Sequence, residues 1–181
     1  MHVLKKAIHA GVNLQTNTPV QSVSLQRDGD GYWVVTTDRG SVRAKNVIYA
    51  TNGYSSALLP ELKGRIVPVK GICSRILNPK RMLLTNNYVM RFSEREYDYL
   101  IPRSDGSIVV GGARADYYSN LDTWFDVSDD STLIESAKNY FDGYMQRHFH
   151  GWEDSGAYTD SVWTGSKLTR LGLHFCRLQC G

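Results

Sequence analysis

The chain has 181 residues, of which 41% are hydrophobic and 22% are charged, with 16 glycines and 5 prolines. This composition is typical of a globular protein and excludes a disordered, fibrous or linker protein. No window approaches the ~18 consecutive apolar residues that a membrane span requires, and residues 1–11 lack the apolar core of a signal peptide. We therefore expect no membrane partner and, by default, a cytoplasmic or organelle-lumen location.

The formal net charge of +3 is concentrated at the end of the chain. Residues 166–181 contain Lys167, Arg170 and Arg177 and no acid, so the 21 basic and 18 acidic side chains of the whole chain leave 18 of each in the first 165 residues. Because there is no basic stripe elsewhere and no nucleic-acid motif, nucleic acid is not expected as a partner.

Cysteine and histidine spacing argues against a metal site. Cys73, Cys176 and Cys180 form no CxxC pair, which excludes a thiolate zinc site and favours a reducing compartment. The five histidines show no ligand spacing, so we expect no bound metal.

In the first third of the chain, an amphipathic helix is predicted over residues 2–10, with Gly11 ending it. Strands at 19–26, 32–38 and 41–44, separated by turn residues, predict a three-stranded meander. The nearly continuous apolar run 46–50 is expected to be a strand buried on both faces, followed by a short helical stretch at 56–62.

The remainder predicts an antiparallel sheet and one long helix. Strands are expected at 65–77, 88–92, 97–102 and 107–111, the last two joined as a hairpin by residues 103–106. A helix is predicted over 129–148 because its apolar residues recur with helical spacing. These are Leu133, Ile134, Ala137, Tyr140, Phe141 and Tyr144. A final strand is expected at 156–165.

Two glycine pairs bear on ligand binding. Gly29 and Gly31 open a GxGxxG pattern that Val34 breaks, and because they join two alternating strands we interpret them as a hairpin turn. Gly111 and Gly112 follow an apolar strand; they either permit close approach of a ligand or form a β-bulge, and a bulge is favoured.

Tyrosine and arginine side chains gather on the predicted hairpin. Tyr97, Tyr99, Arg103 and Arg114 together offer phenolic and charged hydrogen bonds to a carboxylate, although each alone is an ordinary strand residue.

The segment AKNVIYATNGYSSALLPEL at 44–62 resembles the FAD-dependent oxidoreductases of the D-amino-acid oxidase class, in particular amine and amino-acid oxidases similar to gamma-glutamylputrescine oxidase. The order of elements is similar over residues 3–165, including the strand IVPVKG and the hairpin YDYLIPRSDGSIVVGGAR. The implied fold class is α+β or α/β: part of a Rossmann-like FAD domain, with its meander and buried strand, plus an antiparallel substrate domain with a long helix.

The resemblance implies four segments. Residues 1–64 are a partial FAD-binding domain, 65–155 the substrate-binding domain, 156–165 a return strand to the FAD domain and 166–181 an atypical basic tail. The family's GxGxxG unit and its glycine-rich return segment are missing, and the tail looks like a read-through or frame-shifted end. We therefore expect a central fragment of a longer oxidase.

The resemblance also implies sites, with FAD as the cofactor and a small amine or amino acid as the substrate. The cofactor-binding residues are Val20, Ala50, Thr51, Asn52, Gly53 and Gly165, and the substrate-binding residues are Tyr97, Tyr99 and Arg103. No catalytic acid or base is assigned, because enzymes of this family often need no protein base for hydride transfer to flavin.

Three functions remain open at this point. The first is an FAD-dependent oxidation of an amine or amino-acid C–N bond, present here as a truncated and inactive fragment. The second is a non-catalytic interaction module that binds a full-length homologue. The third is a dinucleotide-binding reductase of another class, which the lack of an intact phosphate loop disfavours.

Overall fold

The computed structural model describes residues 2–80, 82–94 and 96–170, with side chains described up to Lys167. It divides into two compact units, Met1–Ala50 and Thr51–Gly181. None of the helices in this described part is long and apolar enough to cross a membrane. The mixed α+β composition with antiparallel sheets agrees with the coarse fold class expected from the sequence, whereas the functional boundaries at 64, 155 and 165 stay predictions.

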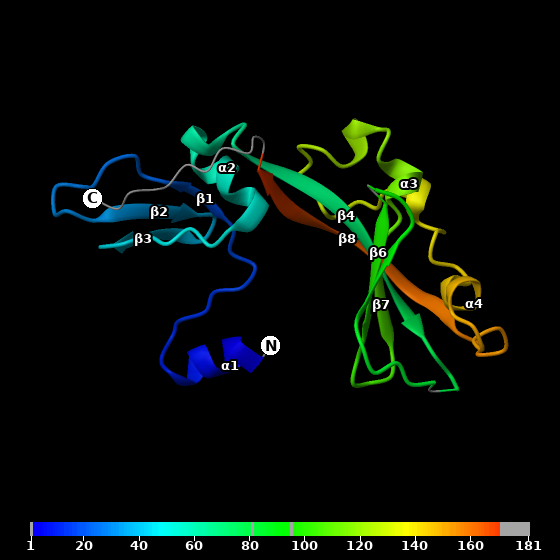
Figure 1. Ribbon diagram of the computed structural model, residues 1–181. Helices are drawn as coiled ribbons and strands as arrows, with labels where there is room; N and C mark the ends of the chain where they lie inside the picture. The colour runs from blue at the N-terminus through cyan, green and yellow to red at the C-terminus, as the bar shows by residue number, and fades with distance from the viewer. Residues whose placement is uncertain (1, 81, 95, 171–181) are drawn as a thin grey trace. The chain divides into compact units, whose positions relative to one another are not determined.

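The first unit contains a helix and a three-stranded meander (Figure 1). Helix α1 (His2–His9) is followed by Gly11, whose φ of 91° suits the glycine expected after a helix end. Strands β1 (Val20–Val23), β2 (Trp33–Thr37) and β3 (Gly40–Ala44) pair antiparallel in the order β1-β2-β3. The predicted meander is therefore confirmed.

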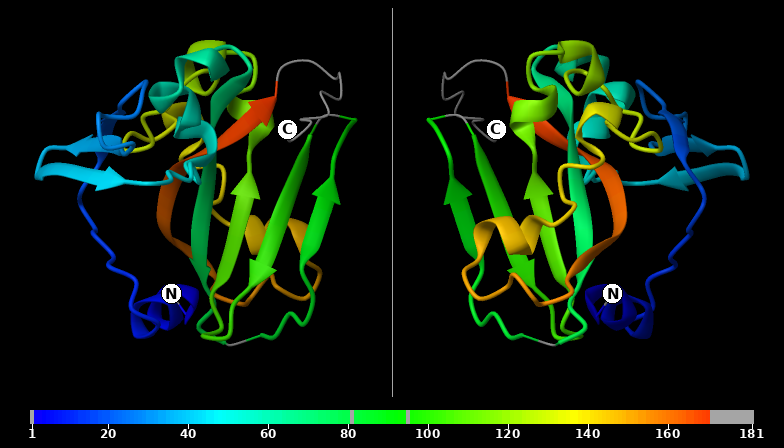
Figure 2. Two further views of the ribbon diagram at one scale, coloured as in Figure 1. Left: turned by 90° about the vertical axis from the view of Figure 1, so that its left-hand side faces the viewer. Right: turned by 90° about the vertical axis from the view of Figure 1, so that its right-hand side faces the viewer.

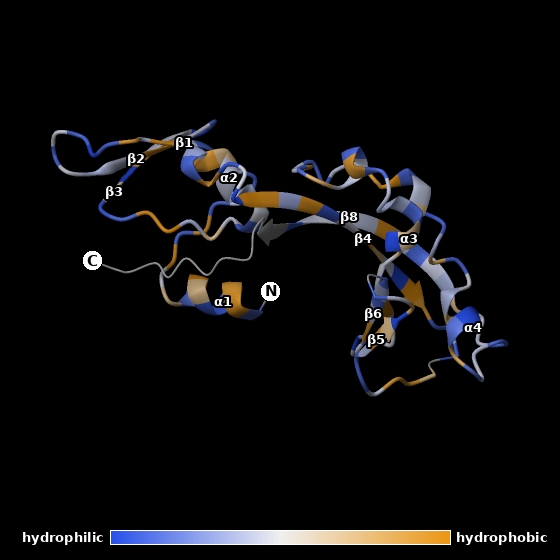
Figure 3. Cartoon of the chain, turned by 45° about the horizontal axis from the view of Figure 1, so that its top comes forward, coloured by the Kyte–Doolittle hydropathy of each residue, from blue (hydrophilic) through white to orange (hydrophobic). Residues whose placement is uncertain are grey.

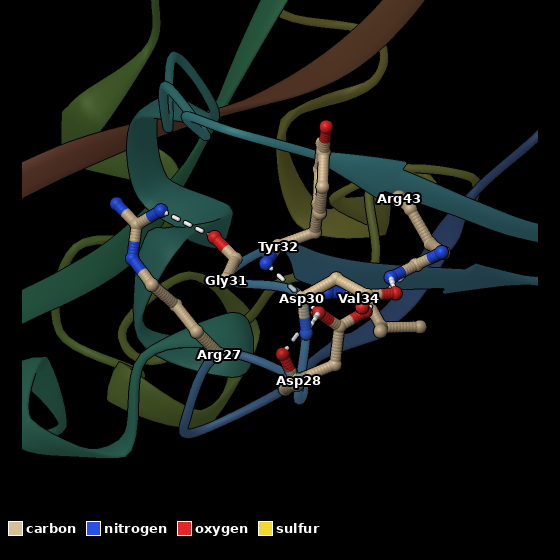
Figure 4. A network of polar contacts seen from close by, with 8 residues as sticks. Arg27, Asp28, Asp30, Gly31, Tyr32, Val34 and Arg43 are labelled. Carbon is tan, nitrogen blue, oxygen red and sulfur yellow. Dashed lines mark hydrogen bonds and ion pairs between the residues drawn. The ribbon is translucent and has the colours of Figure 1, made fainter.

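The turn between β1 and β2 is a hydrogen-bonded hairpin turn (Figure 4). One carboxylate oxygen of Asp28 accepts hydrogen bonds from the backbone N–H of Asp30 at 3.1 Å and of Tyr32 at 2.9 Å. Its other oxygen accepts from Arg43 Nε at 2.7 Å, and the Arg43 guanidinium also pairs with Asp30. This confirms the interpretation of Gly29 and Gly31 as turn residues.

The charge on Asp28 should be measurable by titration. The Arg43 guanidinium, helped by the Tyr32 N–H, lowers the pKa of Asp28 from 3.8 to about 2. A carboxyl whose pKa is depressed on folding stabilises the folded unit above pH 3.8, and this contribution is lost as the pH falls through about 2. We expect an NMR titration of Asp28 to show a midpoint near 2 and Arg43→Gln to move that midpoint toward 3.8.

Arg39→Gln is the control for this titration, because Arg39 contacts Gln15 and Thr18 rather than Asp28. An Asp28 midpoint near 3.8 in the parent chain would contradict the network.

The predicted buried strand at 46–50 is wrong for this structure. These residues form no strand, and Ile48 is 89% exposed. A strand buried on both faces needs hydrogen-bonded neighbours and covering elements, and no segment of the described chain pairs with residues 46–50.

The second unit is built on a five-stranded antiparallel sheet in the order β5-β6-β7-β4-β8 (Figure 2). Short helical turns, η1 (Asn52–Tyr54), α2 (Ser55–Leu58) and η2 (Pro60–Leu62), precede the sheet. The strands are β4 (Ile66–Leu77), β5 (Tyr88–Arg91), β6 (Tyr97–Pro102), β7 (Ile108–Gly112) and β8 (Tyr158–Arg170).

Strands β4 and β8 run side by side along their whole length (Figure 1). Their register pairs Ile66 with Arg170 at one end and Leu77 with Tyr158 at the other. Residues 166–170 of the predicted basic tail therefore belong to β8, while residues 171–181 lie outside the described part of the chain.

One face of this sheet carries the core. Buried residues alternate with partly exposed ones along β4. Figure 3 shows that apolar and polar residues are interspersed along the long strands. Ile72 and Ile76 of β4 pack with Leu100 and Val110 in a cluster that includes Tyr144 and Met145 of helix α4 (Tyr144–His148). Helix α4 covers this face of the sheet (Figures 1 and 2).

The long helix predicted over 129–148 is wrong. Only η4 (Glu135–Ala137) and α4 are helical there, and no helix in the described residues is longer than the eight residues of α1. The Asp129 carboxylate accepts hydrogen bonds from the N–H and hydroxyl of Ser131, and Gly143 has a φ of 64°. These local turns replace the backbone hydrogen bonds that a continuous helix requires.

Candidate functional site

A cavity of about 620 Å³ lies in the second unit, where β7 ends and the chain leaves the sheet. Beyond that point the backbone of Trp124 and Phe125 takes the place of β7 beside β4. The Lys70 N–H donates to Trp124 O at 2.7 Å, and Val69 forms a bridge with Phe125. The cavity is lined by residues 69–73, 97, 99, 112, 114, 117, 118, 124, 125, 163 and 165–167.

Tyr99 lies across Gly111 within the cavity. Register pairs Tyr99 with Gly111 and Gly111 with Cys73, and the Tyr99 hydroxyl is 3.0 Å from Cys73 Sγ. A Cβ at position 111 would overlap the end of the tyrosine ring. Burial, followed by the contact with Cys73, raises the pKa of Tyr99, so the phenol is neutral at neutral pH and can donate a hydrogen bond.

Gly112 leaves space for the Asp98 side chain on the other face of the sheet. A Cβ on residue 112 would overlap the Asp98 carboxylate. The register through Gly111 and Gly112 is regular, so the predicted β-bulge is wrong. The two glycines instead make room for the side chains of consecutive residues on β6, Asp98 and Tyr99, which point to opposite faces.

Asp98 is a buried carboxylate, 2% exposed. It accepts hydrogen bonds from the Tyr140 and Tyr144 hydroxyls, each at 2.7 Å, and from the Ala113 N–H at 3.0 Å. Burial, followed by the hydrogen bonds to Asp98, raises the pKa of both tyrosines. Ala113 has a left-handed φ of 59°, so Asp98 holds the turn from which α3 (Arg114–Tyr117) begins.

Three cationic residues line the cavity. Lys70 Nζ donates a hydrogen bond to Thr132 Oγ1 at 2.8 Å, whereas the other two cations each lie beside an aromatic ring. The Arg114 guanidinium lies 4.2 Å from the centre of the Tyr118 ring, which is stacked on Trp124 at 4.6 Å. Lys167 Nζ lies 5.1 Å from the centre of the Tyr99 ring. Cation–π contacts hold a charge in place without neutralising it.

No acidic residue lines this cavity, and neither Arg114 nor Lys167 forms an ion pair with any residue in the described ranges. Burial raises the pKa of Tyr117, a third phenol of the lining, to about 12. An aromatic cavity with two unpaired cations and neutral phenols is suited to an organic anion such as a carboxylate.

A pair of glycines leaves part of the cavity wall without side chains. Gly71 of β4 is paired with Gly165 of β8. A Cβ on Gly165 would meet nothing within 4 Å, and a Cβ on Gly71 would meet only Gly165 O at 3.9 Å. This exposed stretch of backbone offers a flat surface to a planar group.

Of the three substrate-binding residues expected from the sequence, two line the cavity and one does not. Tyr97 and Tyr99 both line the cavity. Arg103 does not: it lies in the β6–β7 turn, its side chain is 58% exposed, and it is 3.9 Å from Asp105. Lys167 was missing from the expected set, although its spacing of two from Gly165 places both on one face of a strand.

The expected cofactor residues lie in both units. Val20 is in β1 and Ala50 ends the first unit, whereas Thr51, Asn52 and Gly53 begin the second and Gly165 lines the cavity. A Cβ on Gly53 would be 3.0 Å from Lys167 O and 3.3 Å from Pro68 Cα, so packing against β4 and β8 alone requires a glycine there. The roles of these six residues toward FAD stay predictions.

Within the described residues, no group of three or more histidine, cysteine, aspartate or glutamate side chains is arranged to hold a metal ion.

Comparison with known proteins identifies relatives over most of the chain. The family model described as "DAO: FAD dependent oxidoreductase" matches residues 1–171. A glycine oxidase from Pseudomonas aeruginosa is 30% identical, and the match covers 60% of this chain and 29% of that protein.

Solved structures show the same fold in part. Glycine oxidase from Geobacillus kaustophilus has a TM-score of 0.62 and 21% identity, with 91% of this chain and 40% of that chain covered. L-proline dehydrogenase from P. horikoshii has a TM-score of 0.60 and 18% identity, with 90% and 40% covered. The chain thus spans about 40% of the length of these structures.

Proposed function

The chain belongs to the DAO family of FAD-dependent oxidoreductases, and on that premise we propose that its second unit is the amino-acid-binding part of a flavin enzyme that oxidises a C–N bond. The relatives named above act on glycine and L-proline, which favours an amino acid over a polyamine. The closer relation to gamma-glutamylputrescine oxidase that the sequence suggested is therefore the less favoured form of this proposal.

The observation that carries the proposal is the cavity with unpaired cations and no acid. The Lys167 ammonium and the neutral Tyr99 hydroxyl both offer hydrogen bonds to a carboxylate. The contact between Cys73 Sγ and the Tyr99 hydroxyl helps to position the phenol. These residues bind and orient the substrate, while the aromatic lining excludes water from its reacting end.

The residues present fit a flavin in one place. The bare backbone at Gly71 and Gly165 leaves room for a planar ring against the cavity wall. When bound, FAD supplies the chemistry by accepting the hydride from the carbon that bears the amine. These 181 residues contain no GxGxxG phosphate loop.

Binding of glycine or L-proline tests the substrate part of the proposal. Both should change the fluorescence of the cavity tryptophans, Trp124 and Trp163, in a saturable way. Lys167→Met should weaken binding about tenfold, because it removes a charge-assisted hydrogen bond. Lys138→Met is the control, since Lys138 pairs with Glu135 away from the cavity. Unchanged affinity in Lys167→Met would contradict the assignment.

Titration of the full chain with FAD separates enzyme from interaction module. Flavin fluorescence and the melting temperature are followed together, because a ligand that binds only the folded state raises that temperature. Saturable binding supports a flavin enzyme. A folded chain that binds no FAD favours the alternative, a non-catalytic module that acts with a full-length homologue.

A further inference from the structure

Arg114 and Lys167, the two cavity cations that lie beside aromatic rings, come from different elements and contact different rings. Lys167 is on β8, opposite Val69 of β4. Arg114 follows the end of β7, where Gly112 is opposite Ile72 of β4. Because β4 lies between β7 and β8, these two strands are two strand spacings apart, roughly 10 Å.

Each charge is also held at its own ring. Arg114 lies on the Tyr118–Trp124 stack, and Lys167 lies beside Tyr99. Each cation can bind a carboxylate beside its own ring. Two separate anion-binding positions preserve both cation–π contacts.

Arg114 further separates the cavity from an acidic hollow. It lines a second cavity of about 460 Å³ together with Glu94 and Glu96, neither of which is within ion-pair distance of it. Tyr118 also borders both cavities. An anion beside Arg114 on the side of Tyr97 and Tyr99 would meet no acidic residue of the cavity lining.

We propose that the cavity selects an amino dicarboxylic acid, with Lys167 binding one carboxylate and Arg114 the other. This rests on the proposed function and names its substrate class. A ligand with a single carboxylate satisfies Lys167 and Tyr99 but leaves the Arg114 guanidinium without an anion.

Calorimetric titration of the full chain, with and without FAD, tests this with three probes of similar length. Glutarate carries two carboxylates, butyrate carries one, and 5-aminopentanoate carries one carboxylate and one distal ammonium. We expect glutarate to bind at least about tenfold more tightly than butyrate, and 5-aminopentanoate to bind no better than butyrate.

The variants assign each end of the ligand. Arg114→Met should remove the tighter binding of glutarate and leave the affinity for butyrate unchanged. Arg114→Lys should restore part of the tighter glutarate binding, because it keeps the positive charge. Lys167→Met should weaken both ligands. Arg65→Met, an exposed arginine outside the cavity lining, is the control. Near-UV circular dichroism establishes that each variant is folded.

Three outcomes overturn the inference while leaving the proposed function standing. The first is equal affinity for glutarate and butyrate, and the second is an equal loss of affinity for both ligands in Arg114→Met. The third is that 5-aminopentanoate binds more tightly than butyrate, which would place its ammonium toward Glu94 and Glu96. If neither glutarate nor butyrate binds and Lys167→Met does not weaken the binding of glycine or L-proline, the proposed function fails as well.

Discussion

Replacing Gly112 with alanine is expected to lower the free energy of unfolding by roughly 4 kcal/mol, because steric overlap and backbone strain act together. The added Cβ would overlap the Asp98 carboxylate and lie 3.0 Å from Asp98 Cα, and the φ of 152° at Gly112 disfavours any side chain. Asp98 cannot move aside without losing its three hydrogen bonds. Urea denaturation followed by tryptophan fluorescence measures the change.

Alanine substitutions at two other glycines of the same unit distinguish steric overlap from backbone strain. Gly156 has a positive φ of 67° and no atom within 4 Å of the place that a Cβ would take, and Gly165 lies in β8 with the same free space. Alanine at either position should cost no more than about 1 kcal/mol. A loss at Gly112 no larger than at Gly156 would show that contact with Asp98 is unimportant.

Replacing Asp98 with alanine is expected to lower the free energy of unfolding by about 3 kcal/mol. The change leaves the Tyr140 hydroxyl, the Tyr144 hydroxyl and the Ala113 N–H without their acceptor. Each buried unpaired donor costs about 1–3 kcal/mol, and relief of the desolvated carboxylate charge offsets part of the sum. Thermal and urea unfolding, monitored by near-UV circular dichroism, measure the loss.

Asp98→Asn and Asp116→Ala are the matched variants for this experiment. Asparagine keeps the size and one acceptor oxygen of Asp98, so it should be less damaging than alanine. Asp116 is an exposed acid on α3, and its replacement should change stability by no more than about 0.5 kcal/mol. If Asp98→Ala were as stable as the parent chain, the carboxylate would not be what holds the turn at Ala113.

Local patterns predicted the strands well because strands and turns leave short-range signals. Alternating apolar residues and turn residues located the meander of the first unit and the β6–β7 hairpin of the second. In the segment 129–148 the same reasoning identified several buried residues but not their conformation, and it included the exposed Leu133. Ala137, Phe141 and Tyr144 are buried there, yet the left-handed Gly143 and the turn at Asp129 interrupt any helix.

The candidate site was only partly visible in the sequence. Resemblance to a family pointed to Tyr97, Tyr99 and Gly165, and all three line the cavity. Arg103 was misplaced because it is close to Tyr99 in sequence but lies in a turn that extends away from the cavity. Lys167 was missed because its neighbour Tyr99 is on β6, which is separated from β8 by two intervening strands.

Family membership, the order of the strands and the charge balance can all be recognised from residue types along the chain. Three features depend on which strands pair and in what register. They are the requirement for Gly111 and Gly112, the burial of Asp98, and the position of Arg114 and Lys167 at one cavity. A shift of one residue turns every side chain of a strand to the opposite face, and distant pairing sets that register. For this reason only the folded sheet decides which of these residues share a binding site.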